Sequence, residues 1–152
     1  MGKTCYFIGH HNAPAEILPL LETSVEHHIA QYGVMDFVVG KYGSFDCLAA
    51  RAVRKAKQRH PEIRLTLLLA YYNPTQSTGS LSGFDDTLYP DGLELVPKRA
   101  AIVRANQHMI QHSDYLIAYD KGYAGNTRKL VKYARAREER GLICIENLAE
   151  IL

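Results

Sequence analysis

Short, continuous apolar runs alternate along this chain with stretches whose apolar residues recur at helical spacing. The runs lack the polar alternation of a strand with one face in water, and helical crossovers favour parallel strands. The pattern therefore predicts an α/β fold, a Rossmann-like doubly wound parallel sheet of about five strands with helices on both faces. The expected strands are residues 4–8, 34–39, 63–70, 115–119 and 142–145, and the expected helices are approximately residues 14–29, 46–59, 97–110 and 128–140.

Right-handed crossovers in such a sheet predict the strand order 3-2-1-4-5, in which the direction of winding reverses between strands one and four. Ligands of doubly wound proteins bind at the carboxyl ends of the strands beside that reversal. Residues 9–12, 40–44 and 120–127 follow the strands at this place. We therefore expect these three loops to meet and to form the functional site.

A length of 152 residues fits one domain, and no internal repeat is evident, so residues 1–152 are predicted to form a single domain. Residues 71–96 are polar and make a connection too long for an ordinary turn, which predicts either a lid or binding loop or disorder. Within this connection, residues 84–90 are compatible with a short edge strand or with a turn.

The chain contains no signal-peptide pattern and no apolar run of membrane-spanning length, which predicts a cytoplasmic protein with no membrane partner. Its three cysteines are an odd number, and they lie in strand or helix patterns and not in loops. We therefore expect Cys5, Cys47 and Cys144 to be free thiols that pack in the core.

Two loops carry a pair of glycines between a strand pattern and a helix pattern, at residues 40–46 and at residues 122–127. A strand that enters a helix through glycines leaves backbone N–H groups unpaired at the positive end of the helix dipole, where phosphate binds. Together the two loops indicate a nucleotide-like ligand. The alternative interpretation is that both loops are structural turns, with Ser44 and either Asn126 or Thr127 as N-caps.

The net charge of +2 is too small to indicate a dedicated nucleic-acid binder, but the charge is unevenly distributed. Residues 97–140 contain ten Lys or Arg and four Asp or Glu, a net charge of +6. This excess is compatible with an anionic ligand, and equally with a solvated face of the helix expected at residues 128–140.

Several further side chains lie near the expected site. His10 and His11 follow the first strand, where an imidazole could hydrogen-bond phosphate or transfer a proton, or could be an ordinary surface-loop histidine; His10 is the one expected to bind the ligand. Tyr71 and Tyr72 begin the long connection and are the best placed tyrosines for stacking on a base. His108 and His112 lie one helical turn apart, but no third ligand is evident, so no metal site is predicted.

Two sets of short motifs lie in a distinctive order. Gly40-x-x-Gly43-x-x-Asp46 is followed by Ala49-Ala50, and Arg104-x-Asn106-x-x-Met109 and Ser113-Asp114 precede Gly122-x-x-Gly125-Asn126-Thr127. In order and spacing these motifs resemble the SLOG superfamily, a Rossmann-like group that includes DNA-processing protein A and the "lonely guy" phosphoribohydrolases. The resemblance is closest to the YpsA-like branch and spans nearly the whole chain.

The resemblance implies that a nucleotide or nucleotide-derived ligand binds between these loops. It implies phosphate contacts from Gly40, Gly43, Gly125 and Thr127, a ribose contact from Asp46 and a further phosphate contact from Arg104. With the loop residues added, the expected ligand-binding residues are Gly9, His10, Gly40, Gly43, Ser44, Asp46, Tyr71, Arg104, Gly122, Gly125, Asn126 and Thr127.

The chain departs from the hydrolases of this group in one respect. Those enzymes resemble one another in a Pro-Gly-Gly-x-Gly-Thr-x-x-Glu motif whose glutamate takes part in cleaving the N-glycosidic bond, whereas here no glutamate follows Thr127 until Glu138. We therefore expect a sensor or binding module, with no catalytic residue assigned.

Two other functions are weighed against this expectation. One is a nucleoside 5′-phosphate N-glycosidase that uses Asp46 or Asp120 as its carboxylate. The other is single-stranded DNA binding by the basic helix expected at residues 128–140. Association of identical chains through the third helix is compatible with each of these functions.

Overall fold

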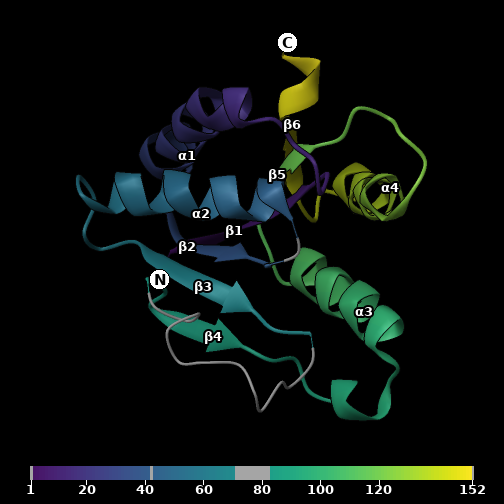
Figure 1. The fold of residues 1–152 in the computed structure, drawn as a ribbon. Helices are drawn as coiled ribbons and strands as arrows, with labels where there is room; N and C mark the ends of the chain where they lie inside the picture. The colour runs from purple at the N-terminus through teal and green to yellow at the C-terminus, as the bar shows by residue number, and fades with distance from the viewer. Residues whose placement is uncertain (1, 42, 71–82, 152) are drawn as a thin grey trace.

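In the computed structural model, residues 2–41, 43–70 and 83–151 are described, and they form one parallel sheet with helices on both faces (Figure 1). The strand order is β4-β3-β2-β1-β5-β6, and every neighbouring pair is parallel. The predicted Rossmann-like doubly wound fold is confirmed, and so is the relative order of the five expected strands. The strands are β1 (Lys3–Gly9), β2 (Val34–Val39), β3 (Arg64–Leu68), β4 (Asp86–Leu88), β5 (Tyr115–Tyr119) and β6 (Cys144–Asn147).

The sixth strand, β4, corrects the expected number of about five. It pairs with β3, and Asp85 anchors it because the backbone N–H of Asp85 donates to Leu65 O (2.8 Å) while its Oδ2 accepts from Leu65 N–H (2.7 Å). Asp86 and Thr87 are exposed, so this strand has no apolar run by which the sequence could reveal it. Residues 84–90 thus contain an edge strand, whereas residues 71–82 of the long connection lie outside the described residues.

The helices divide between the two faces of the sheet (Figure 1). One face is covered by α1 (Leu18–Tyr32), which follows a short 3₁₀ helix, η1 (Ala15–Ile17), and by α2 (Ser44–Lys57). The other face is covered by α3 (Lys98–Gln111), which follows η3 (Leu93–Leu95), and by α4 (Asn126–Glu139). A last 3₁₀ helix, η4 (Leu148–Glu150), follows β6.

Burial on both faces explains the continuous apolar run of β1. Cys5 and Phe7 pack into the core under α1 and α2, whereas Tyr6 and Ile8 pack into the core under α3 and α4. All four side chains are at most 5% exposed. A strand covered on both sides needs an apolar residue at every position, which is the pattern that predicted a parallel sheet.

The opposite situation holds at β6, the edge strand beside β5. This strand begins at Cys144, two residues later than expected, and Leu142 and Cys144 are exposed. Cys47 is exposed as well, on α2. Core packing is therefore confirmed for Cys5 and was wrong for Cys47 and Cys144. For Cys144 the reason is that an apolar pattern does not distinguish an edge strand from a central one, whereas Cys47 lies on the exposed side of α2.

A side chain of α4 pairs with the backbone of this edge strand. The Ile145 N–H donates to Glu138 Oε2 (2.8 Å), and Glu138 Oε1 accepts in turn from Arg135 Nη1 (2.9 Å). One amide of β6 is thus bonded to a carboxylate of the same chain.

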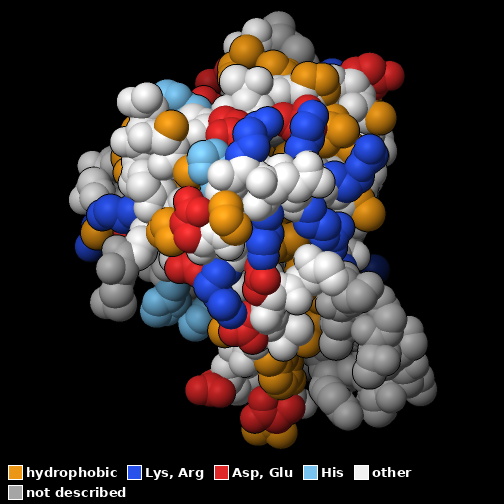
Figure 2. Space-filling model, turned by 90° about the vertical axis from the view of Figure 1, so that its left-hand side faces the viewer, with side chains coloured by type: hydrophobic (Ala, Val, Ile, Leu, Met, Phe, Trp, Pro, Cys, Tyr) orange, Lys and Arg blue, Asp and Glu red, His pale blue; other side chains and the backbone are white. Residues whose placement is uncertain are grey.

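Charges of both signs are mixed on the face of the molecule at the left of Figure 1, where α2 ends (Figure 2). Lys55 Nζ lies 3.0 Å from Glu22 Oε2, and Arg59 pairs with Glu26, so that ion pairs join α1 to α2 and to the turn that follows it. In the described part of the chain, no helix combines the length and the apolar character needed to cross a membrane.

Candidate functional site

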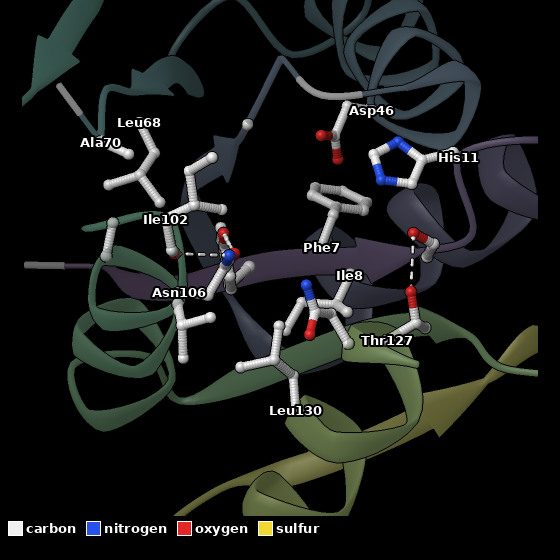
Figure 3. Close-up of a pocket in the computed structure, with 16 residues that line it drawn as sticks. Phe7, Ile8, His11, Asp46, Leu68, Ala70, Ile102, Asn106, Thr127 and Leu130 are labelled. Atoms are coloured by element: carbon white, nitrogen blue, oxygen red, sulfur yellow. Dashed lines mark hydrogen bonds between the residues drawn. The ribbon is translucent and has the colours of Figure 1, made fainter. Parts of the chain in front are cut away.

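A cavity of about 200 Å³ lies at the carboxyl ends of β1, β2 and β3, between α2, α3 and α4. Most of its polar lining comes from the residues after β1 and from the first turns of α2 and α4, and its apolar lining comes from β1, the end of β3, α3 and α4 (Figure 3). This cavity, called the cleft below, occupies the place that the topology predicts, and loops from three strands reach it.

The first turn of α2 is tied to the loop that follows β1. Ser44 N–H donates to His11 O (2.8 Å), and the Ser44 hydroxyl lies within hydrogen-bond distance of His11 O (2.7 Å) and Ala13 O (2.8 Å). Ser44 is thus the first helical residue and fixes the β1 loop, so the structure does not have the Ser44 N-cap of the alternative interpretation. The N-cap is Gly43, and no side chain caps the helix.

Asp46 lies in the first turn of α2, as expected, and lines the cleft. Figure 3 shows its carboxylate on the same side of the cleft as the imidazole of His11, which also lines the cavity. A carboxylate in this position can accept hydrogen bonds from the hydroxyl groups of a sugar.

The first turn of α4 has the same design as that of α2. Its N-cap is Gly125, with φ 145° and ψ −169°, close to the values of Gly43, φ 149° and ψ −178°. This region of backbone conformation is essentially restricted to glycine, which explains why each helix begins with one. The alternative interpretation, in which Asn126 or Thr127 is the N-cap, is therefore not what the structure shows.

Asn126 and Thr127 instead line the cleft. Thr127 Oγ1 donates to Gly9 O (3.3 Å), a bond that joins the start of α4 to the end of β1 (Figure 3). Gly9 has its own packing constraint, since a Cβ atom there would lie 2.3 Å from Cγ of the buried Phe45. Close packing at Gly9 thus brings β1 against the first turn of α2.

The far side of the cleft is apolar. Leu68 and Ala70 from the end of β3 face Ile102 of α3 across this part, and Leu130 of α4 adds to it (Figure 3). An apolar lining beside a polar first turn can hold a ring on one side and charged or hydroxyl groups on the other.

A polar pair lies at the edge of this apolar part. The hydroxyl of Tyr6 donates to Asn106 Oδ1, and Asn106 Nδ2 donates to Ile102 O (2.8 Å). Sequence reasoning placed Asn106 in a family motif without assigning it a contact, and it missed Tyr6; it named His11 beside His10 but chose only His10 as a ligand-binding residue. The apolar lining could not be found from the sequence, because these residues look the same as core residues.

His10 is placed differently from its neighbour. Its side chain is 9% exposed and is absent from the described lining of the cleft, and its Nε2 accepts a hydrogen bond from Lys121 N–H (2.9 Å). Burial lowers the pKa of His10 below its ordinary value of 6.5, and the nearby charge of Lys121 lowers it further, whereas Asp120 acts in the opposite direction. His10 therefore holds the loop after β5 and does not reach the cleft.

The loop after β5 is held from a second direction by Asn147 of β6. Asp120 N–H donates to Asn147 Oδ1 (3.0 Å), and Asn147 Nδ2 donates to Asp120 O (2.9 Å). Asp120 Oδ1 in turn accepts from Gly122 N–H (2.8 Å), and Gly122 adopts φ 88°. The carboxylate of Asp120 thus closes a tight turn.

The twelve expected ligand-binding residues fall into four groups. Five line the cleft, two are N-caps, three hold or shape loops, and two lie elsewhere: Arg104 is exposed and absent from the described lining, and Tyr71 lies outside the described residues. The lining residues are Gly9, Gly40, Asp46, Asn126 and Thr127, the N-caps are Gly43 and Gly125, and the loop residues are His10, Ser44 and Gly122.

Within residues 2–41, 43–70 and 83–151, no three His, Cys, Asp or Glu side chains lie close enough together to hold a metal ion. The chain matches no known protein-family model and no curated protein sequence, so its membership of the SLOG superfamily stays a prediction from its motifs.

Proposed function

We propose that this chain binds a nucleotide or a nucleotide-derived small molecule in the cleft and acts as a sensor or binding module. The observation that carries the proposal is that α2 and α4 both begin at glycine N-caps beside the same cleft, and neither has a side-chain cap. First-turn N–H groups of an uncapped helix bind anions, and two such helices suit a ligand with phosphate groups.

The lining supports a definite placement of such a ligand. A base fits the apolar part between β3 and α3, where Leu68 and Ile102 lie, and the sugar fits beside Asp46. The phosphate then lies at the start of α4, near Thr127. A volume of about 200 Å³ is below the range of roughly 300–1,000 Å³ of most ligand sites, so part of the ligand extends over the opening.

The small number of carboxylates in the cleft favours binding without turnover. Hydrolysis of a glycosidic bond commonly uses two, and Asp46 is the single carboxylate among the described residues that line the cleft. Asp120, the alternative candidate, accepts a backbone hydrogen bond within its own loop. An N-glycosidase would therefore lack one of its two groups here.

Binding of single-stranded DNA is less well supported, because two basic side chains of α4, Arg128 and Arg135, already have partners within the chain. Arg128 Nη1 donates to Gly122 O (3.2 Å), and Arg135 contacts both Glu138 and Glu150. A basic helix that binds a nucleic-acid backbone would offer these charges to phosphates.

The test is a thermal-shift screen of the protein with nucleoside mono-, di- and triphosphates, ADP-ribose, cyclic nucleotides and a short single-stranded DNA. A ligand at 100 times its dissociation constant adds about 2.7 kcal/mol to the free energy of unfolding. Calorimetry of the best ligand with Asp46→Asn and Thr127→Val should show weaker binding, whereas Glu139→Gln, an exposed change at the other end of α4, should bind as the parent does.

Three results would count against the proposal. If no nucleotide stabilised the protein, the proposal would be refuted. If both cleft variants bound the ligand as the parent does, the binding site would have to lie elsewhere in the molecule. Release of free base during incubation would replace binding by the N-glycosidase, and stabilisation by DNA alone, lost steeply with salt, would replace it by nucleic-acid binding.

A further inference from the structure

The end of β1 holds the start of α4 through two successive residues. Gly9 O accepts from Thr127 Oγ1, and the imidazole of His10 accepts from Lys121 N–H. Residues 120–125, called the β5–α4 loop below, lie between these two points and lead into the N-cap at Gly125. The bond from Lys121 to His10 therefore contributes to the position of α4 relative to the cleft, together with the two bonds between Asp120 and Asn147.

That bond requires one particular protonation state. An imidazole nitrogen that accepts a hydrogen bond carries no proton, so Nε2 of His10 is unprotonated and the ring is neutral, with its hydrogen on Nδ1. The side chain is 9% exposed and lies between two rings, edge-on to Tyr119 (centroids 5.7 Å apart) and against Tyr123 (5.1 Å).

A competing partner lies close to the same nitrogen. Asp120 Oδ1 is 3.9 Å from His10 Nε2 and accepts from Gly122 N–H (2.8 Å). A proton on Nε2 would place two donors, His10 and Lys121 N–H, against each other, and the nearest anionic acceptor for the new N–H is Asp120. Formation of that pair would break the bond to Lys121 and loosen the turn that Asp120 closes.

The other charged and titratable groups around His10 act in both directions. The charge of Asp120 raises the pKa of His10, whereas burial, which is the largest effect, together with the charges of Lys121 and His11 lowers it. The neutral ring is thus the form present at neutral pH, and acidification is the condition that changes it.

We propose that His10 is a positioning residue that couples protonation to ligand binding: the neutral ring holds the β5–α4 loop and the first turn of α4 at the cleft, and the protonated ring releases them. The ligand affinity of the cleft then falls on acidification. The part of this inference that concerns ligand affinity rests on the proposed function, whereas the part that concerns the loop does not.

The loop is tested first, without ligand. The titration of His10 is followed by NMR of ¹⁵N-labelled protein, and the hydrogen exchange of the Lys121 amide is measured from pH 7.5 to pH 5 and corrected for intrinsic rates. Protection of this amide should fall by about 5- to 10-fold as His10 titrates, the factor expected for loss of one hydrogen bond. Unchanged protection while His10 titrates would overturn the proposal.

Two variants separate the proton from the shape of the side chain. In His10→Gln the amide oxygen can still accept from Lys121 N–H but does not titrate, so the protection of this amide should become independent of pH. His27→Gln, a change of an exposed histidine on α1, is the matched control and should keep the pH dependence of the parent.

The second arm uses ADP-ribose as the probe, because its phosphate diester groups stay ionised throughout this pH range. Its affinity for the parent should fall by about 5- to 10-fold between pH 7.5 and pH 5, and His10→Gln should remove most of that fall. A fall of the same size in His10→Gln would overturn the coupling and would point to His11, which lines the cleft. Lack of ADP-ribose binding at every pH would count against the proposed function, and amide exchange would then decide the role of His10 alone.

Discussion

Replacement of Gly43 and Gly125 by alanine, one at a time, separates two costs that differ between otherwise matched positions. Both glycines are N-caps with nearly the same backbone conformation, φ 149° at Gly43 and φ 145° at Gly125, with ψ close to 180°. An alanine in this conformation costs about 1–3 kcal/mol of stability in backbone strain. That strain should be nearly equal in the two variants.

The surroundings of the two positions differ. A Cβ atom at Gly43 would lie 2.7 Å from His11 Cα and 2.8 Å from His11 Nδ1, whereas a Cβ atom at Gly125 meets no heavy atom of the described residues within 4 Å. The contact with a backbone atom cannot be relieved by rotation of a side chain, and overpacking of this kind costs about 1–3 kcal/mol more. We therefore expect losses of about 1–3 kcal/mol for Gly125→Ala and about 2–6 kcal/mol for Gly43→Ala.

Urea unfolding followed by circular dichroism measures these losses, and for a chain of this length each kcal/mol corresponds to about 2–4 °C of melting temperature. Gly141→Ala is the control, because Gly141 has φ 73° and open space around it, so that a loss of about 1–2 kcal/mol is expected. A loss in Gly125→Ala as large as that in Gly43→Ala would refute the reasoning, since it would mean that the contact with His11 has no energetic weight.

Three further outcomes are expected from the packing and the titrating groups. Gly9→Ala should destabilise the fold by about 1–3 kcal/mol in urea unfolding because its Cβ atom would lie 2.3 Å from Phe45 Cγ, and adding Phe45→Leu should restore part of the loss; no restoration would contradict this explanation. Ellman's reagent should label two thiols of the native protein quickly and Cys5 only after denaturation, since Cys5 is fully buried and burial raises the pKa of its thiol; fast labelling of all three would be inconsistent with the core. The free energy of unfolding should decrease as the pH falls from about 6.5, because burial lowers the pKa values of His10, His28 and His108 in the folded state, and the unfolded chain then binds more protons; urea titrations at pH 7.5, 6.5 and 5.5 with equal midpoints would refute this expectation.

The sequence predicted the centre of the sheet well and its edges poorly, for one physical reason. From Cys5 to Ile8, the positions of β1 alternate between the two helix layers, so burial produces an unbroken apolar run that identifies a parallel strand. Strand β4 contains the exposed residues Asp86 and Thr87, and β6 exposes Cys144, because an edge strand needs little apolar surface. An apolar sequence pattern therefore identifies the buried strands of the sheet but not the exposed strands at its edges.

The site was predictable to the level of its loops but not of its side chains. Topology brought Asp46 and Thr127 to one cleft, as expected. It could not decide between His10 and His11, whose side chains point to different surroundings although the residues are adjacent. The identity of the N-caps was not predictable either. Serine is a typical N-cap residue, and only the backbone angles show that the N-cap of α2 is Gly43 and not Ser44.

The carboxylate of Glu138 that accepts from Ile145 N–H has a consequence for how copies of this chain can meet. Unpaired amides on an edge strand recruit strands from other molecules, which is the first step toward intermolecular sheets and aggregates. Here α4 supplies a substitute acceptor for one such amide, and Arg135 keeps that acceptor in place. Growth of the sheet beyond β6 by addition of a strand from a second copy is thereby disfavoured.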